Sequence, residues 1–424
     1  MINVLVFPCG SEIGLEIHAA LSYCKNIVLV GVSSVSDHGA LAYENHEQIT
    51  ANVKSDNLLD QLNELIEKWR IDVVFPAHDS VIFRLAQGAG ELNAIVIAPE
   101  YEIAAICRNK NLTYDYLDAA YTPVRITGHG GPYPIFGKPA VGQGSVGAEI
   151  ILDEIRHHQF NSCGAEYVFT EYLPGKEFTV DCISSCTGEL LHIAPRERLR
   201  VKAGISVRTR PVQTNKGFHR IAVDIASKMR LKGAWFFQVK EDRQGVYKLL
   251  EVAPRVSGSM AVSRCLGVNY ALLSVYAHLG IPFDVLPQQY SIVMDRALRS
   301  RFQIDFKYEK VYLDLDDTLI VKGRVHPVLI ALLYQWAASN TPVILVTRHA
   351  KQPYATLEHY RIHAGLFFDI CHVRDGSPKS ACIDPAARAI FIDDSYRERK
   401  EVHEQLGLPV FDVDSVEQLL APGH

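Results

Sequence analysis

The chain of 424 residues lacks a long uninterrupted apolar run. Its longest nearly apolar stretch, residues 325–338, is interrupted by His326, Pro327 and Gln335 and is too short to cross a bilayer. The first residues, MINVLVFPCGSEIG, contain no basic segment and only a strand-length apolar run, which argues against a signal peptide. We therefore expect no membrane partner.

Cysteine, glycine, proline and excess positive charge are also scarce. The nine cysteines are an odd number without a CxxC pair, which argues against a disulfide framework and a cysteine-based zinc site and favours the reducing cytoplasm. The net charge of −5 and the absence of a basic tract give no footprint for nucleic acid. Hydrophobic residues make up 48% of the chain, which is typical of a globular protein, and its length suggests close to three domains.

The first hundred residues alternate short apolar runs with amphipathic stretches. Buried parallel strands are predicted at residues 3–7, 27–32, 73–76 and 95–98, with a helix at residues 58–69. This pattern indicates an α/β class chain that begins with a doubly wound, Rossmann-like domain over residues 1–105. The segment PCGSEIG at residues 8–14 follows the first strand, where it either offers backbone N–H groups to an anion or forms a simple tight turn.

Residues 106–290 change in character and predict an α+β module. Strands are predicted at residues 167–173, 177–184, 190–194, 234–240 and 247–252, with a helix at residues 220–229. Lys138 ends an earlier strand and is followed by a glycine loop that contains Gly144 and Ser145. Such a loop either lets backbone N–H groups and a lysine approach phosphate oxygens or is an ordinary hairpin.

The sequence beyond this loop adds groups that suit a nucleotide. Residues 171–181 predict a strand, a turn and a second strand, which offer backbone groups to an adenine edge and place Glu177 near ribose hydroxyls. Gln238 and Glu251 lie on paired strands, and such oxygen ligands suit Mg²⁺ bridging nucleotide phosphates.

Together these motifs resemble the ATP-grasp superfamily, particularly the branch of the carbamoyl-phosphate synthetase large subunit and the purine-pathway carboxylate ligases. The resemblance covers roughly residues 1–290 and makes residues 1–105 its pre-ATP-grasp domain. It implies that ATP activates a carboxylate as an acyl phosphate, which an amine then displaces. The implied ATP-binding residues are Lys110, Lys138, Gly144, Ser145, Glu171, Leu173 and Glu177. The implied metal ligands are Gln238 and Glu251, and Arg255 would steady the transferring phosphoryl group.

One position departs from the family pattern. Family members usually carry Glu-x-Asn before Pro-Arg, whereas this chain has Ala253 at the Asn position. Glu251 would then bind two ions with more water, or a second ion would bind weakly, or catalysis would be impaired. A regulatory module that senses ATP is therefore the alternative to an active ligase.

Three arginines alternate at positions 196, 198 and 200, which would place them on one face of a strand. They form either a solvated edge strand or a wall of the cleft that holds a carboxylate or phosphate of the substrate. Arg196 and Arg198 are the predicted substrate ligands.

Residues 309–424 predict a second Rossmann-like domain, with strands at 311–315, 343–347, 389–392 and 410–413 and a helix at 327–338. Its first strand runs into Asp314 and Asp316, where one carboxylate can attack phosphorus and the other can act as acid and base. Thr347 can bind a phosphoryl oxygen and Lys379 can stabilise the aspartyl-phosphate. The predicted metal ligands are Asp314, Asp316, Asp393 and Asp394.

This order of motifs closely resembles the haloacid dehalogenase-like (HAD) phosphohydrolases. The intervals after Leu319 and after Thr347 are too short for a large cap domain. The alternatives are aspartates that only cap surface structure and a domain that binds phosphate without hydrolysis. The combined interpretation is a bifunctional cytoplasmic enzyme that uses ATP and Mg²⁺, with Mn²⁺ as an alternative ion. Its partners would be a small carboxylate, an amine and a phosphorylated small molecule, and the sequence does not indicate an oligomeric state.

Overall fold

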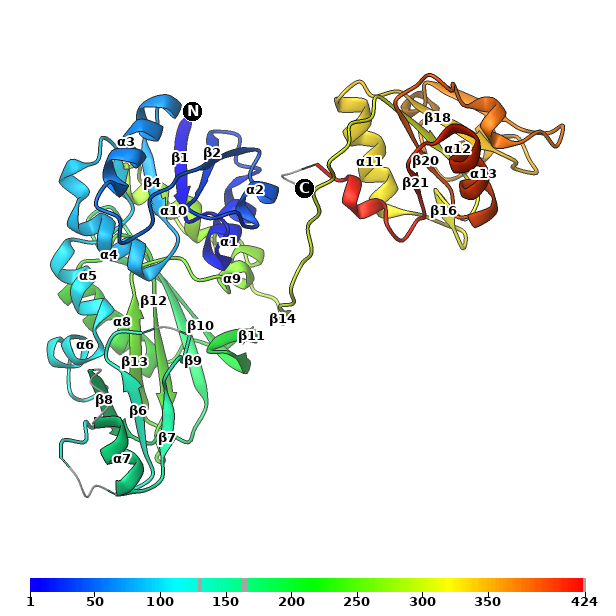
Figure 1. Cartoon of the computed structure of the whole chain (residues 1–424). Helices are drawn as coiled ribbons and strands as arrows, with labels where there is room; N and C mark the ends of the chain where they lie inside the picture. The colour runs from blue at the N-terminus through cyan, green and yellow to red at the C-terminus, as the bar shows by residue number, and fades with distance from the viewer. Residues whose placement is uncertain (129–131, 143, 162–165, 422–424) are drawn as a thin grey trace. The chain divides into compact units, whose positions relative to one another are not determined.

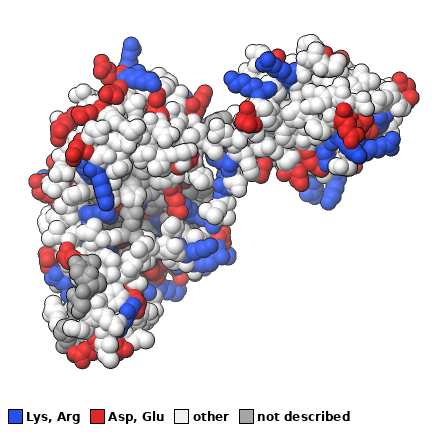
Figure 2. Space-filling model, in the orientation of Figure 1, with Lys and Arg blue, Asp and Glu red and all other residues white. Residues whose placement is uncertain are grey.

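The computed structural model describes residues 1–128, 132–142, 144–161 and 166–421. The chain divides into two compact units, Met1–Arg299 and a second unit that begins at Ser300 (Figure 1). Among the described helices, none combines the length and apolar character needed to cross a membrane. On the face shown in Figure 2, basic and acidic side chains are interspersed over both units.

The first unit begins with a five-stranded parallel sheet in the order β3-β2-β1-β4-β5. The strands are β1 (Ile2–Phe7), β2 (Ile27–Ser33), β3 (Asn45–Gln48), β4 (Val73–Pro76) and β5 (Ile95–Val96). The helices that connect them are α1 (Glu12–Leu21), α2 (Gly39–Ala42), α3 (Leu58–Trp69) and α4 (Asp79–Gln87). The strands β1, β2, β4 and β5 were predictable because they are short and apolar, and the bounds of α3 and β4 match the prediction. The polar strand β3 was not predicted.

Two helices, α5 (Tyr101–Arg108) and α6 (Lys110–Tyr116), lead into two antiparallel sheets. The smaller has the order β7-β6-β8, and the larger has the order β13-β12-β9-β10-β11-β14. The strands of the smaller sheet are β6 (Ile135–Pro139), β7 (Glu149–Ile151) and β8 (Tyr167–Glu171). The strands of the larger are β9 (Glu177–Ser184), β10 (Leu190–Lys202), β11 (Ile205–Pro211), β12 (Gly233–Glu241), β13 (Tyr247–Ala253) and β14 (Met294–Asp295).

Strand β10 corrects one interpretation of the sequence. It extends through the three arginines to Lys202 and is paired on one side with β9 and on the other with β11. β10 is therefore an inner strand of its sheet, although its pairing with β9 ends at Glu197 and Arg200 is exposed. The apolar run that marked the strand ends at Ala194, which is why the prediction stopped there.

Helices pack on the larger sheet and close the core of the first unit. The apolar face of α8 (Lys216–Met229) packs against the buried Trp235 and Phe237 of β12. Helix α10 (Tyr270–His278) contributes Val275 to a cluster that includes Val4 of β1 and Phe236 of β12. The parallel sheet and the larger antiparallel sheet therefore share one core within this unit.

The second unit contains a five-stranded parallel sheet in the order β19-β18-β15-β20-β21. The strands are β15 (Lys310–Leu313), β18 (Val343–Thr347), β19 (Asp369–His372), β20 (Ala389–Ile392) and β21 (Val410–Phe411). Its helices are α11 (Pro327–Ala338), α12 (Pro353–His359) and α13 (Tyr396–Leu406). A hairpin of β16 (Ile320–Val321) and β17 (Arg324–Val325) fills the interval before α11. The unit has its own core, which includes Leu313, Leu333 and Trp336.

Two cysteines of the second unit are paired with each other. Cys371 of β19 and Cys382 of the short 3-10 helix η3 (Lys379–Cys382) form a disulfide. Their separation of 11 residues is no recognised motif, and only the folded chain brings them together. One pair is not a disulfide framework, and the six other described cysteines are free.

Candidate functional site

Two cavities of the first unit, of about 310 Å³ and about 220 Å³, share part of their walls. Every residue predicted to bind ATP, metal or substrate in this unit lines at least one of them. The shared residues include Lys110, Gly144, Arg198, Gln238 and Glu251. The smaller cavity adds Lys138, Ser145, Glu171, Leu173 and Glu177, and the larger adds Arg196, Ala253 and Arg255.

Two lysines are buried in the walls of these cavities. Lys138 of β6 donates to the Tyr114 hydroxyl at 2.8 Å and to the Leu250 carbonyl at 3.1 Å. Burial, with a smaller effect of Lys110, lowers the pKa of Lys138 to about 7. Burial also lowers the pKa of Lys110, whose ammonium donates to the Gly142 carbonyl at 3.2 Å. An anion bound beside these lysines would favour their charged forms.

The glycine loop is held close to the turn between β10 and β11. Gly144 has φ of +63°, a conformation that favours glycine. A Cβ on Gly204 would lie 2.2 Å from the backbone of Gly144, so only glycine allows this approach. The loop thereby contributes Gly144 to both cavities and Ser145 to the smaller one.

The predicted metal ligands are paired across neighbouring strands. Gln238 of β12 lies opposite Glu251 of β13, and its amide donates to the Glu251 carboxylate at 2.7 Å. One carboxylate and one amide oxygen suit an ion that nucleotide phosphates and water also coordinate. Ala253 lines the larger cavity with a methyl group, so this position supplies no further ligand.

Arg255 is engaged by another part of the first unit. Its guanidinium pairs with the carboxylate of Asp79 at 2.5 and 2.9 Å and lies 5.1 Å from the centre of the Phe236 ring. Burial acts to raise the pKa of Asp79, but the Arg255 charge outweighs it and holds that pKa below its usual range. Asp79, the first residue of α4, was not predicted as part of the site. A phosphoryl group at Arg255 would therefore compete with Asp79.

Arg196 is almost fully buried. Its guanidinium binds Asp181 through two hydrogen bonds of 2.8 and 3.0 Å and donates to the Ser257 hydroxyl at 3.1 Å. Its Nη1 atom is buried and has no hydrogen-bond partner among the described residues. Arg196 also lines the larger cavity. Nη1 is therefore the guanidinium nitrogen of Arg196 that is available to a ligand.

Arg198 and Glu177 form an ion pair of 2.8 Å. Arg198 also donates to the Gly204 carbonyl at 2.7 Å. Because they are paired, Glu177 has fewer free acceptor positions for ribose and Arg198 has fewer free N–H groups for substrate. Arg200, by contrast, is exposed and pairs with Asp295.

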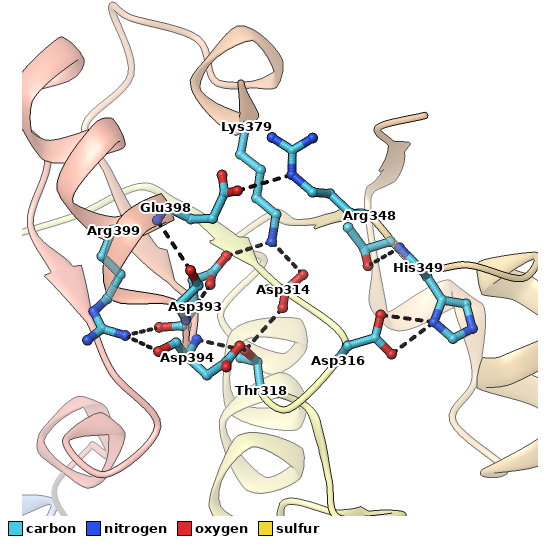
Figure 3. A network of polar contacts seen from close by, with 12 residues as sticks. Asp314, Asp316, Thr318, Arg348, His349, Lys379, Asp393, Asp394, Glu398 and Arg399 are labelled. Carbon is cyan, nitrogen blue, oxygen red and sulfur yellow. Dashed lines mark hydrogen bonds and ion pairs between the residues drawn. The ribbon is translucent and has the colours of Figure 1, made fainter. Parts of the chain in front are cut away.

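The second unit gathers its predicted residues at the carboxyl ends of adjacent strands (Figure 3). Asp314 follows β15, Asp393 follows β20, and Lys379 begins η3. The Lys379 ammonium lies 2.7 Å from the Asp314 carboxylate and 2.6 Å from that of Asp393. All three side chains are buried.

One lysine therefore faces two buried carboxylates. Burial raises the pKa of Asp314 to about 7, with Lys379 opposing the shift and Asp393 adding to it. Burial likewise raises the pKa of Asp393. Burial acts to lower the pKa of Lys379, but the two aspartates outweigh it and raise the value. The cluster thus lacks one positive charge.

A divalent cation fits this deficit. Ligand oxygens of Asp314, Asp393 and Asp394 lie within 4.8 Å of one another. The Thr318 hydroxyl lies 3.2 Å from carboxylate oxygens of both Asp314 and Asp394. Three carboxylates in this arrangement suit Mg²⁺.

Asp316 lies outside the carboxylate cluster. Figure 3 shows its side chain turned toward His349, whose Nδ1 lies 2.9 Å from both carboxylate oxygens. Asp316 is about half exposed, so it is open to solvent. His349 also contacts Thr356, and its backbone N–H donates to the Thr347 hydroxyl. His349 was not predicted, because a histidine two residues after Thr347 carries no motif of its own.

Comparison with known proteins bears on the first unit. Residues 165–297 match a family described as ATP-grasp in the biosynthetic pathway with Ter operon. N5-carboxyaminoimidazole synthetase from Staphylococcus aureus complexed with ADP is similar in structure at 15% identity and a TM-score of 0.57, over 70% of this chain and 82% of that chain. The first unit has the ATP-grasp fold.

No curated protein matches the chain. Other solved structures resemble it. Biotin carboxylase from Campylobacter jejuni has 17% identity and a TM-score of 0.55, over 66% of this chain and 71% of that chain. L-amino acid ligase from Bacillus licheniformis has 18% identity and a TM-score of 0.50, over 66% and 74% respectively. The ATP-grasp unit, Met1–Arg299, makes up a similar share of the sequence.

Proposed function

We propose that the ATP-grasp unit is an ATP-dependent carboxylate–amine ligase. The observation that carries the proposal is the pair of adjoining cavities, one lined by Lys138 and Glu171 and the other by Arg196. Their shared wall contains Lys110 and Glu251, as transfer of a phosphoryl group between two bound substrates requires. Similar structures named as an L-amino acid ligase and as an ADP complex of a synthetase agree with this class of reaction.

In this proposal ATP occupies the smaller cavity. Glu171 and Leu173 bind adenine, Glu177 binds ribose, and the glycine loop with both lysines binds the phosphates. Gln238 and Glu251 would hold Mg²⁺, which neutralises phosphate charge. Arg196 orients the substrate carboxylate through its Nη1 atom.

The carboxylate oxygen then attacks the γ-phosphorus of ATP, and the bond to ADP breaks. The product is an acyl phosphate. An amine attacks the acyl carbon, loses a proton and displaces phosphate, which leaves an amide. Arg255 stabilises the transferring phosphoryl group if it exchanges Asp79 for phosphate oxygens.

The ligase proposal is tested by ADP release from the full chain with pairs of small carboxylic acids and amines. We expect a pair that raises ADP release in the wild type but not in an Arg196→Gln variant. Arg200→Gln is the matched control, because Arg200 is exposed and lies outside both cavities. ATP binding without ADP release for any pair would instead favour the regulatory alternative.

We propose in addition that the second unit is a HAD-like phosphatase. Its support is the buried group of Asp314, Lys379 and Asp393, with Asp316 exposed beside it. Asp314, Asp393 and Asp394 would hold Mg²⁺, which neutralises the substrate phosphate. An Asp314 oxygen attacks phosphorus while Asp316 protonates the departing oxygen. Water then attacks the aspartyl-phosphate, Asp316 takes its proton, and phosphate leaves.

The phosphatase proposal is tested with variants of two neighbouring aspartates. Asp314→Asn should abolish phosphate release because the nucleophile is lost. Asp316→Asn should slow it by removing the acid and base, about 10²–10⁴-fold. Because the described residues of the second unit include no large cap domain, the substrates should include phosphorylated products of the ligase as well as small esters. Wild-type turnover by Asp314→Asn on any accepted substrate would refute the mechanism.

The two activities would act in sequence on one small molecule. In this proposal the ligase joins a phosphorylated acid or amine, and the phosphatase removes the phosphate afterwards. Unphosphorylated analogues should then be poor ligase substrates. Equal ligase rates with phosphorylated and unphosphorylated substrates would separate the two functions.

A further inference from the structure

A cluster of three different potential metal ligands lies in the parallel sheet of the first unit, apart from both proposed sites. Cys9 follows β1, Asp37 lies in the loop after β2, and His46 lies on β3. Their ligand atoms, one sulfur, one oxygen and one nitrogen, all lie within 4.8 Å of one another. None of the three residues lines the two cavities.

The surrounding structure holds the donors in place. The Ser33 hydroxyl lies 3.1 Å from the Cys9 sulfur and donates to the Asp37 carboxylate at 2.9 Å. The backbone N–H of Gly39 donates to the same carboxylate oxygen at 2.8 Å. Asp37 is therefore fixed by two donors that leave its second oxygen available.

His46 adds an unsatisfied polar atom to this arrangement. Its Nε2 is buried and has no hydrogen-bond partner among the residues that the structure describes. A buried polar atom of this kind costs free energy unless something binds it. Packing of the three side chains against one another does not provide that partner.

Two glycines make the close approach of these side chains feasible. A Cβ on Gly10 would lie 2.1–2.3 Å from the Asp37 carboxylate atoms. A Cβ on Gly39 would lie 2.2 Å from the Cys9 sulfur. Any larger residue at either position would therefore push a donor out of the cluster.

We propose that Cys9, Asp37 and His46 bind one divalent cation of the zinc class. A thiolate and an imidazole are ligands that Zn²⁺ accepts and that Mg²⁺ and Ca²⁺ do not prefer. Ligand atoms around a tetrahedral zinc ion lie about 3.5 Å apart, so the donors need to move by no more than about 1 Å. The fourth position is left for water.

A reactive thiol is the competing explanation of the cluster. Burial raises the pKa of Cys9 to about 12, with hydrogen bonding to Ser33 opposing the shift and Asp37 adding to it. The thiolate is both the nucleophile and the metal ligand, so this pKa does not separate the two explanations, and the geometry has to decide between them. The mixed ligand set and the unsatisfied His46 nitrogen fit a cation better than they fit thiol chemistry.

The test is titration of the full, metal-free chain with Co²⁺, followed by absorption spectroscopy. Cobalt bound to a thiolate gives a charge-transfer band in the near ultraviolet, which the all-carboxylate cluster of the second unit cannot produce. We expect one thiolate-bound Co²⁺ per chain, displaced by Zn²⁺. The band should disappear in Cys9→Ser. In His46→Gln the affinity for Co²⁺, measured from the band, should fall at least tenfold.

Cys265→Ser is the matched control, because Cys265 is an exposed free cysteine that is not one of the three cluster residues. It should retain the band. Circular dichroism verifies the fold of each variant, and His46→Gln with Asp37→Asn decides the matter if Cys9→Ser does not fold. Absence of the band in the wild type, its persistence in Cys9→Ser, its loss in Cys265→Ser, or unchanged affinity in both His46→Gln and Asp37→Asn would overturn the proposal.

Discussion

Replacing the proposed nucleophile Asp314 by asparagine should abolish phosphatase turnover and at the same time stabilise the second unit. Lys379 lies within ion-pair distance of both Asp314 and Asp393, and all three groups are buried. Two carboxylates therefore share one ammonium. Asp314→Asn removes one negative charge and leaves Lys379 and Asp393 as a balanced pair. When no divalent cation is present, the free energy of unfolding of the variant should therefore exceed that of the wild type.

The magnitude follows from the pKa of Asp314. Its value of about 7 in the folded state lies above the ordinary value of 3.8, mainly because of burial. The protonated form is favoured on folding, so this contribution is complete below pH 4 and is lost as the pH rises through 7. About three pKa units correspond to about 4 kcal/mol. Because asparagine does not reproduce every contact of the carboxylate, we expect a net gain of about 2–4 kcal/mol at pH 8 and none at pH 4.

The assay is thermal and urea unfolding of the second unit within the full chain, at pH 4 and pH 8, in EDTA and in Mg²⁺. Mg²⁺ should stabilise the wild type more than Asp314→Asn, because the ion supplies the missing positive charge. Asp316→Asn is the matched control: its side chain is about half exposed, so its effect on unfolding should stay below about 1 kcal/mol. Lower stability of Asp314→Asn than of the wild type at pH 8 in EDTA would show that Lys379 compensates both carboxylates and would refute the reasoning.

Three further predictions concern the nucleotide and the metals. Lys138→Met should weaken ATP binding by about 1.5–3 kcal/mol in calorimetry, because a charge-assisted contact is lost; unchanged affinity would remove Lys138 from the phosphate site. Ala253→Asn should tighten the Mg²⁺ dependence of ATP turnover by adding an oxygen ligand; an unaltered titration would mean that this position does not face the metal. In the second unit, apparent Mg²⁺ affinity should rise with pH up to about 7 and level off above it, because a proton on Asp314 competes with the ion; a constant affinity from pH 5 to pH 7 would contradict this.

The predictable parts of the fold are buried strands and helices with one apolar face. Strands β4, β18 and β20 and helices α3 and α11 have the predicted bounds because apolar runs or helical spacing define them. Strand β3, with the sequence NHEQ, lies at the edge of its sheet and has no such run. The arginine-rich half of β10 was missed because its charges are neutralised by residues remote in sequence. The residue pattern of β10 alone does not reveal these ion pairs, because the partners lie in other segments.

The residues of the candidate sites were predictable where the order of strands brings them together. In the second unit, parallel strands bring their carboxyl ends together, so Asp314 and Asp393 had to meet once their strands were adjacent. No comparable rule connects Arg255 to Asp79, which lies 176 residues earlier, or Lys138 to Tyr114. These contacts arise from the packing of α4 and α6 near the antiparallel strands. The types of residue in the sites followed from the sequence, but their partners did not.

The partners alter what the sites must do on binding. Arg255, Arg198 and Lys379 are all predicted to meet phosphate or carboxylate groups, and each is already paired with a carboxylate of the protein. Such pairs keep a buried cation compensated before a ligand arrives, because an isolated buried charge costs several kcal/mol. An anionic substrate must then replace the carboxylate or share the cation with it. Binding should therefore be weaker than the number of cations suggests and more selective for ligands that match the geometry of the displaced carboxylate. Removing Asp79 or Glu177 should accordingly free Arg255 or Arg198 to bind simple anions at the expense of that selectivity.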